Sequence, residues 1–332
     1  MMHSTLVPAP RRWQTWLAAS AYWLVAVAVY FLFPRNLSLA SSILVMSMFV
    51  LSLDLVLGFA GIVSFGHAVF FGIGAYAAAL LVLNGYAEPI TGALISGAFA
   101  GAFALIISPV VLRVSGLPQI MVTLSFAVIL FEVANKAVWL TKGDDGIGGI
   151  EPLPLLGVFK WTAFGQTQFW YALGWLFVIF VVVRQVLASP LGLALQGCRE
   201  NAQRMRFIGT SVVGKLTMAY VLSGFVAGIA GAVSTQTTKF VGLDAMSVDR
   251  SIDALVMLVL GGAGRLWGAL LGTPIYMTVR QFAAQWNPFH WMFVVGGMLV
   301  VIVMLARGGL LGLVEQLRSR KPRGSAGGVH HG

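Results

Sequence analysis

The stretch IDALVMLVLGGAGRLWGALLGTPIYMTVRQ (residues 252–281) is almost wholly apolar, and GGAGR (261–265) interrupts it near the middle. Each limb is shorter than the roughly 20 residues that an α-helix needs to cross a bilayer. Backbone that is interrupted at membrane depth is tolerated only where protein or a water-filled cavity surrounds it. The segment therefore predicts a broken, re-entrant helix within a membrane protein of many helices.

The composition supports a lipid environment. The chain has 332 residues, of which 58% are hydrophobic and only 10% charged, whereas soluble domains carry about 25% charged residues. The net charge of +10 comes from basic residues in short loops between apolar runs, which indicates membrane orientation and not nucleic-acid binding. The single cysteine, Cys198, cannot form an internal disulfide. The sequence predicts no metal, no cofactor and no nucleic-acid partner.

Other apolar runs are long enough for helical crossings. They occupy residues 13–33, 37–57, 62–83, 90–112, 117–140, 169–187, 212–235 and 289–306. The first follows Arg11 and Arg12 and is longer than the core of a cleaved signal peptide, the alternative reading of that run. With the two limbs of 252–281, the sequence predicts about ten membrane segments, all in one transmembrane domain over residues 1–310.

Basic residues set the orientation, because they collect on the cytoplasmic side. Residues 184–215 are strongly basic, with Glu200 their only acid, so this loop and the N-terminus are predicted to be cytoplasmic. The longest polar loop, 141–168, then lies outside. Residues 311–332 form a basic tail, predicted to be disordered and cytoplasmic. For the tail to lie inside, segment 252–281 must enter from the outside and return there.

A polar helix is predicted at about residues 190–209, between two apolar runs. Its apolar positions recur at spacings of three and four, which places them on one face. Ser189-Pro190 suits a helix start, and Gly209 suits a helix stop. Two interpretations remain open. The helix either rests on lipid headgroups or docks into a cytoplasmic partner and transmits force.

Four motifs carry a family resemblance. They are SPLGLALQGCREN (189–201) followed by FIG (207–209), GFAGIVSFGH (58–67) running on to GIGAY (72–76), TKGDDGI (141–147), and VLGGAGRLWG (259–268). The first resembles the coupling-helix motif of permeases in ATP-binding cassette (ABC) importers, and all four resemble the branched-chain amino acid permeases of the LivM/LivH family in the family's order. The chain departs from the pattern at Asn201, where Ala is general, and at Asp54, where a neutral polar residue is expected.

The resemblance implies an all-α bundle like that of type II ABC importer permeases, which performs no catalysis of its own. It implies a bacterial inner-membrane location and three kinds of partner: a second homologous permease, two cytoplasmic ABC ATPases and an external solute-binding protein. The chain would form half of the translocation pathway for branched-chain amino acids. Urea or short amides are the alternative cargo in the same family.

The candidate site residues fall into three groups. Arg199, Glu200, Asn201 and Gly209 are predicted to couple the permease to its ATPases. Gly66, His67, Gly261, Gly262 and Gly264 are predicted to belong to the translocation pathway. Asp144, Asp145 and Glu151 are predicted to contact the binding protein.

A different class of function also needs consideration. In a proton-driven secondary transporter, Asp54 or Glu132 would carry the proton, because an ionisable group in a span is a functional candidate. The structural interpretations are that Asp54 reaches cytoplasmic water and that Glu132 pairs with Lys136 one turn away. His67 is either a buried, hydrogen-bonded residue or part of the pathway. GTSVVGKL (209–216) lacks the Ser or Thr that a phosphate-binding loop needs after its lysine, so ATP hydrolysis is assigned to separate subunits.

Overall fold

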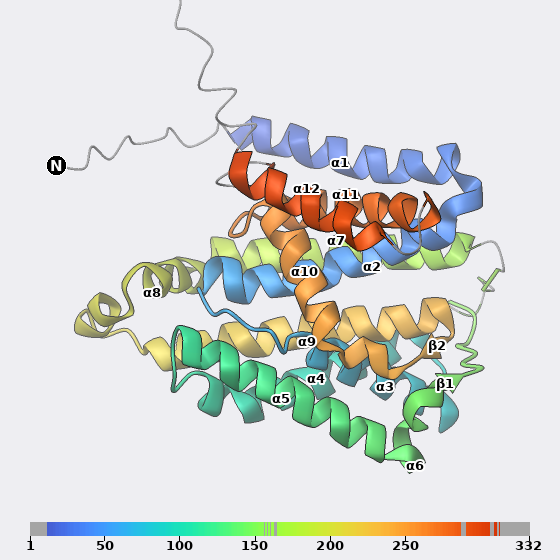
Figure 1. Cartoon of the computed structure of the whole chain (residues 1–332), viewed down its shortest axis with the longest axis horizontal. Coiled ribbons are helices and arrows are strands. Elements are labelled where there is room, and N and C mark those ends of the chain that lie inside the picture. Colours follow the sequence, from blue (N-terminus) through green and yellow to red (C-terminus); the bar gives the residue numbers. More distant parts are fainter. Residues whose placement is uncertain are drawn as a thin grey trace, which may run out of the picture.

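A computed structural model describes residues 12–155, 157, 159, 161–162, 165–286, 290–305, 309–310 and 312. Long helices dominate it and run along a common direction (Figure 1). The elements are α1 (Arg12–Leu32), η1 (Pro34–Asn36), α2 (Leu37–Leu53), η2 (Asp54–Phe59), α3 (Ala68–Leu83), α4 (Pro89–Val111), α5 (Leu117–Lys136), α6 (Val138–Thr141), η3 (Gly143–Asp145), β1 (Ile147–Gly148), α7 (Gln166–Ala188), α8 (Pro190–Phe207), α9 (Val212–Thr238), β2 (Phe240–Val241), η4 (Leu243–Met246), α10 (Val248–Gly261), α11 (Leu266–Trp286) and α12 (Trp291–Leu305).

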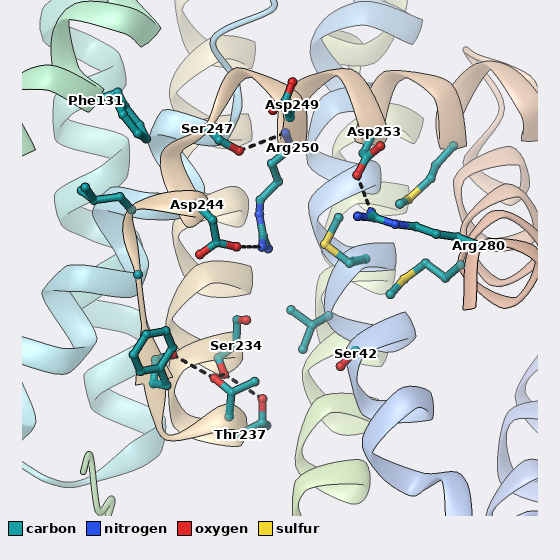
Figure 2. Close-up of a pocket in the computed structure, with 18 of the residues that line it drawn as sticks. Ser42, Phe131, Ser234, Thr237, Asp244, Ser247, Asp249, Arg250, Asp253 and Arg280 are labelled. Atoms are coloured by element: carbon teal, nitrogen blue, oxygen red, sulfur yellow. Dashed lines mark hydrogen bonds and ion pairs between the residues drawn. The ribbon is translucent and has the colours of Figure 1, made fainter. Parts of the chain in front are cut away.

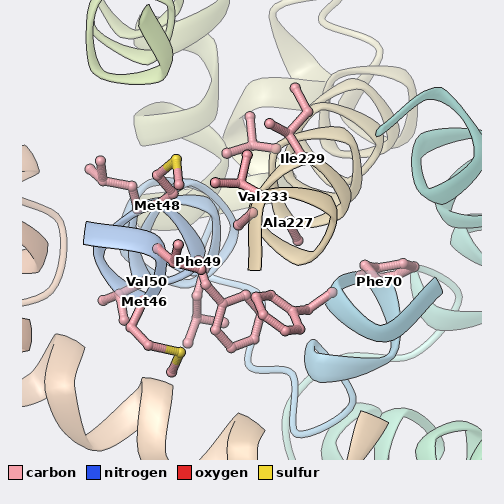
Figure 3. Packing of buried hydrophobic residues seen from close by; sticks show 14 of the residues in the cluster. Met46, Met48, Phe49, Val50, Phe70, Ala227, Ile229 and Val233 are labelled. Atoms are coloured by element: carbon pink, nitrogen blue, oxygen red, sulfur yellow. The ribbon is translucent and has the colours of Figure 1, made fainter. Parts of the chain in front are cut away.

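Helix α9 packs against α2, α3 and α4. Small residues allow this close approach, as is usual between helices in membranes: a side chain at Gly231 would collide with the backbone of Phe71, and Gly74 lies against Gly228. Figure 3 shows large side chains filling the remaining space, among them Phe49 of α2, Phe70 of α3 and Val233 of α9. All three side chains are buried.

The two ends of the bundle differ in character. Helix α8 projects at one end, and α6 with the β1–β2 pair lies at the other (Figure 1). The strands are antiparallel and pair Ile147 with Val241. This pairing ties the segment after α6 to the connection between α9 and α10. Because Ile147 and Ile150 are also buried, the described start of the predicted external loop is packed against the bundle.

The predicted class, an all-α polytopic membrane protein, is confirmed. Within the described residues, five helices are long and apolar enough to cross a membrane, or six if the bent pair α10 and α11 forms one span. The total of about ten membrane segments remains a prediction. The predicted tail, residues 311–332, lies outside the described residues except for residue 312, as does Arg11.

The continuous span predicted at 62–83 is wrong. Helix α2 runs into a π-helical turn, η2, the chain is then irregular, and α3 begins only at Ala68. The π-type bonds persist at the exit, where Ala60 N–H donates to the Leu55 carbonyl over 3.3 Å. Gly61 follows with a φ of +76°, which turns the chain out of the helix. Single π-helical turns of this kind occur frequently at functional sites.

Candidate functional site

The break between α10 and α11 bends the chain by 114°. Gly262 and Gly264 make this turn with φ angles of +111° and +80°, in the left-handed region where a residue with a side chain is strained. The interruption predicted at Gly261, Gly262 and Gly264 is therefore present, with α11 directed back from the turn.

The two glycine-rich breaks contact each other. The Asp54 carboxylate, at the start of η2, accepts a hydrogen bond from the Gly264 backbone N–H over 2.7 Å. The side chain of Asp54 is 0% exposed, so the interpretation that it reaches cytoplasmic water is wrong. A buried carboxylate needs donors to offset its lost hydration, and the backbone of the second break supplies one. Asp54 thereby joins the end of α2 to the α10–α11 turn.

Arg199 of α8 reaches into this junction. Its guanidinium donates to the carbonyl oxygen of Gly58, and its Cγ lies 2.9 Å from the position that a Cβ at Gly61 would take. A Cβ at Gly264 would lie 2.8 Å from Arg199 Nη1. One side chain of α8 therefore contacts both breaks. We name Asp54, Gly58, Gly61, Arg199 and Gly264 the junction.

Helix α8 is not the continuous helix that the sequence predicts. Asn201 has φ −158° and ψ +93°, which divides α8 into two arms. Its side-chain oxygen accepts a hydrogen bond of 2.8 Å from the Arg204 N–H, so Asn201 caps the start of the second arm. At the kink, Gly197, Glu200 and Met205 line a cavity of about 300 Å³ together with Asn201 and Arg204.

The helix stop predicted at Gly209 is present. Gly209 N–H donates to the Arg206 carbonyl, and Thr210 N–H donates to the Met205 carbonyl, each over 3.0 Å. This pair of bonds is a Schellman motif, which requires a left-handed residue between helix and loop. Gly209 supplies it with a φ of +83°. The turn sends the chain from α8 into α9.

A polar cavity of about 810 Å³ is lined by the first half of α10 and by residues of β2 and η4. Figure 2 shows two ion pairs facing it. Arg250 contacts Asp244 at 2.6 Å, and Arg280 contacts Asp253 at 2.5 Å. The lining residues come from α2, α5, α9, α10, α11 and the segments around η3 and η4: Ser42, Val45, Met46, Phe131, Asp144, Ser234, Thr237, Thr238, Phe240, Gly242, Leu243, Asp244, Ser247, Asp249, Arg250, Asp253, Met257, Met277 and Arg280.

Comparison with known proteins identifies the family. Residues 36–303 match the family described as the permease component of branched-chain amino acid transport systems. The chain belongs to this family. The match includes both breaks, α8 and the cavity, and it confirms the prediction made from the four motifs. The protein is a permease subunit of an ABC importer and not an enzyme.

Relatives of this permease are similar over most of their length. The LivM permease of the high-affinity branched-chain amino acid transport system of Salmonella typhimurium is 26% identical over 325 residues, covering 90% of this chain and 76% of the relative. The Escherichia coli K12 LivM protein is 28% identical over 309 residues, covering 86% and 72%. The autoinducer 2 import permease LsrC of Enterobacter is 29% identical over 283 residues, covering 81% and 78%. No solved structure matches the chain significantly.

His67 is buried in the permease bundle and absent from the lining of the large cavity. Its Nε2 lies 2.8 Å from the Ser52 hydroxyl and 3.4 Å from that of Ser223, and its ring stacks on Phe49. Gly66 lies against the backbone of Thr123. Of the two interpretations, burial with hydrogen bonds describes His67 here, although its partners are hydroxyl groups and not backbone.

The predicted external acids of the permease, Asp144, Asp145 and Glu151, are all exposed. Asp144 also lines the polar cavity. Glu132 and Lys136 are exposed on α5, but no ion pair joins them in the described part of the chain. The expected pair is therefore absent there.

The sequence interpretation missed the cavity and its ion pairs. A signal was present, because Asp253 and Arg280 stand inside the apolar segment 252–281, where a charged group costs several kcal/mol unless it faces protein or water. The same reasoning that singled out Asp54 and Glu132 applies to them.

Proposed function

We propose that this permease carries branched-chain amino acids across the bacterial inner membrane, as LivM proteins are named for doing. It would pair with a second homologous permease to enclose the pathway. Two cytoplasmic ABC ATPases and an external solute-binding protein complete the assembly. Another relative is named for the import of autoinducer 2. The solute of this permease must therefore be identified by measuring transport.

The observation that carries the mechanism is the contact of Arg199 with both breaks. The first arm of α8 is fixed to the bundle by buried Leu195 and Cys198, and Arg199 extends this attachment to Gly58 and Gly264. A displacement of α8 by the ATPases would therefore reach the end of α2 and the α10–α11 turn. Glu200, Asn201 and Gly209 would present α8 to the ATPase and fix its exit. Alternating access then follows from movement of the broken helices.

We place the end of the bundle that bears α8 in the cytoplasm, together with both chain termini. The strongly basic composition of residues 184–215 supports this orientation. Segment 252–281 is then re-entrant, with its turn directed toward the cytoplasm, and the 114° bend supports that interpretation. Gly261, Gly262 and Gly264 would act in the pathway by forming this turn, whereas Gly66 and His67 would act from the packed interior, where they contact Thr123 and Ser52.

The opposite end would receive the binding protein. Asp144, Asp145 and Glu151 are exposed there, and basic residues of a partner would complement them. Asp144 borders the cavity, so a solute released at this platform would meet the cavity directly. A proton-driven transporter is less well supported, because Asp54 is bound to Gly264 and does not line the cavity.

Two substitutions in α8 test the coupling. Gly209→Val places a β-branched residue at a φ of +83°, and Glu200→Lys reverses the exposed acid at the kink. Each variant, reconstituted in liposomes with its ATPases and binding protein, is expected to insert normally but to lose leucine uptake. It is also expected to lose hydrolysis stimulated by loaded binding protein.

Gly85→Val is the matched control, because Gly85 has a φ of +87° with open space around its Cβ position and lies between α3 and α4. It carries similar backbone strain away from α8 and should retain both activities. Wild-type uptake and stimulation in Gly209→Val and Glu200→Lys would contradict the coupling assignment and favour a helix bound only to headgroups.

A further inference from the structure

The charges of α10 and α11 gather on one cavity. Arg250 and Asp253 are neighbours on the first turns of α10, and Arg280 reaches the same space from α11. Figure 2 shows the Asp244–Arg250 pair on one side of the cavity and the Asp253–Arg280 pair on the other. In a chain with only 10% charged residues, this concentration within helices of the membrane domain needs a physical reason.

Stability is a weak reason for these ion pairs. Ion pairs that water reaches contribute only about 0.2–1 kcal/mol, because water screens the charges and both side chains lose conformational freedom. Each pair remains open to the cavity, since Arg280 is 43% and Asp253 26% exposed. Asp253 is also held by the Tyr276 hydroxyl over 2.5 Å, and the Arg250 guanidinium lies 5.2 Å from the centre of the Phe71 ring. The charged groups of both ion pairs are thus held in place, and all four residues line the cavity.

The lining matches one chemical class of solute. Guanidinium groups bind carboxylates in two-point geometry, and the two Asp carboxylates accept from an ammonium group. Val45, Met46, Met257 and Met277 belong to the apolar part of the lining, and the flexible thioethers adapt to side chains of different branching. A volume of about 810 Å³ lies within the range of ligand sites, about 300–1,000 Å³.

We propose that this cavity holds the solute in transit, and that the solute is a zwitterion with an apolar side chain. The carboxylate binds Arg250 or Arg280, and the ammonium group binds Asp253 or Asp244, in exchange for the ion pairs seen here. Urea and short amides carry neither charge and therefore offer nothing to exchange for these ion pairs. The inference rests on the proposed function and adds the site and the groups that bind the two charges of the solute.

The location of the cavity along α10 links it to the junction. The same helix carries Arg250 and Asp253 beside the cavity and then reaches the Gly262–Gly264 turn, where Gly264 contacts Asp54. Movement of that turn shifts α10 against α11 and therefore changes the distance between Asp253 and Arg280. The two charges that bind the zwitterion are thus carried by the helices that α8 displaces.

Protection from labelling tests the site directly. In the purified permease–ATPase complex without binding protein, Cys198→Ala removes the native thiol, and Ser42→Cys places one in the cavity lining. Leucine is expected to slow modification of this thiol by a small methanethiosulfonate reagent several-fold. Leucinamide, 4-methylpentanoate and urea, which lack one or both charges, should protect far less. Arg280→Gln and Arg250→Gln should each weaken the protection by leucine, and Arg113→Gln, at the turn between α4 and α5, should leave it unchanged.

Uptake in liposomes with all partners separates this inference from the proposed function. Arg280→Gln is expected to reduce leucine uptake roughly tenfold or more, as the loss of one member of a charge pair does in binding. Equal labelling with and without leucine, or full protection in both arginine variants, overturns the cavity assignment even when wild-type uptake is normal. Absence of ATP-dependent leucine uptake by the wild type refutes the proposed function, while the protection assay still decides the class of solute.

Discussion

The junction makes Gly264 sensitive to a single methyl group. In Gly264→Ala the new Cβ would stand 2.8 Å from Arg199 Nη1 and 3.0 Å from the Gly58 carbonyl oxygen, closer than ordinary contacts. A side chain at its φ of +80° costs about 1–2 kcal/mol. Displacing the guanidinium removes a charged hydrogen bond to Gly58, which is worth about 1.5–3 kcal/mol. The two costs add to roughly 2.5–5 kcal/mol, and we expect the contact between α8 and the breaks to be destabilised by that amount.

Gly85→Ala isolates the backbone component. Its φ of +87° is similar, but nothing lies within 4 Å of its Cβ position, so only the strain of about 1–2 kcal/mol remains. With both variants reconstituted with ATPases and binding protein, Gly264→Ala is expected to lose most stimulated hydrolysis and uptake. Gly85→Ala should retain them at a modest cost in thermal stability.

A double-mutant cycle identifies the contact responsible. Arg199→Ala removes the guanidinium that the new methyl group would strike, so Gly264→Ala should do less damage in that background than in the wild type. Equal losses in Gly264→Ala and Gly85→Ala, or strictly additive effects of the Arg199 and Gly264 substitutions, would refute the argument that the junction transmits the motion of α8.

Three further expectations concern segments 252–281 and 141–168 and the first arm of α8. Single cysteines at Val248 and Gln285 should both react with an impermeant reagent from the outer face, and reaction from opposite faces would contradict a re-entrant 252–281. Charge reversal of Asp144 and Asp145, both exposed, should weaken docking of the binding protein and uptake without affecting membrane assembly, whereas normal docking would indicate a plain connecting loop. Burial raises the pKa of the Cys198 thiol, so less reactive thiolate is present at a given pH and maleimide labelling near neutral pH should be slow; labelling as fast as that of an exposed cysteine would show that the first arm of α8 is not packed as described.

Local signals were the most informative part of the sequence. Local signals predict the break at 261–265, the helix end at Gly209 and the membrane helices. Each of these structures depends only on the conformation of a few neighbouring residues and on the surrounding solvent. Motifs in the correct order also sufficed to predict the family. These features do not depend on which distant segment packs nearby.

The contacts that assemble the site depend on distant pairings. Asp54 meets Gly264, and Arg199 meets Gly58, and no periodicity in the sequence specifies such partners. The kink at Asn201 was predictable in principle, because an Asn side chain competes with helix bonds by capping the N–H groups that follow it. The apolar spacing through Met205 favoured an unbroken helix and obscured that local signal.

The kink at Asn201 separates a first arm of α8 that packs on the bundle from a second arm that does not. Leu195, Cys198 and Arg199 fasten the first arm of α8 to the bundle, whereas the chain beyond the kink turns outward and leaves Phe207 82% and Ile208 69% exposed. A cap held by one side-chain hydrogen bond is a weaker restraint than the packing of buried Leu195 and Cys198 in the first arm. Changing the direction of the exposed second arm therefore costs less free energy than displacing the buried first arm, and we expect α8 to adapt to a neighbouring surface before its first arm moves.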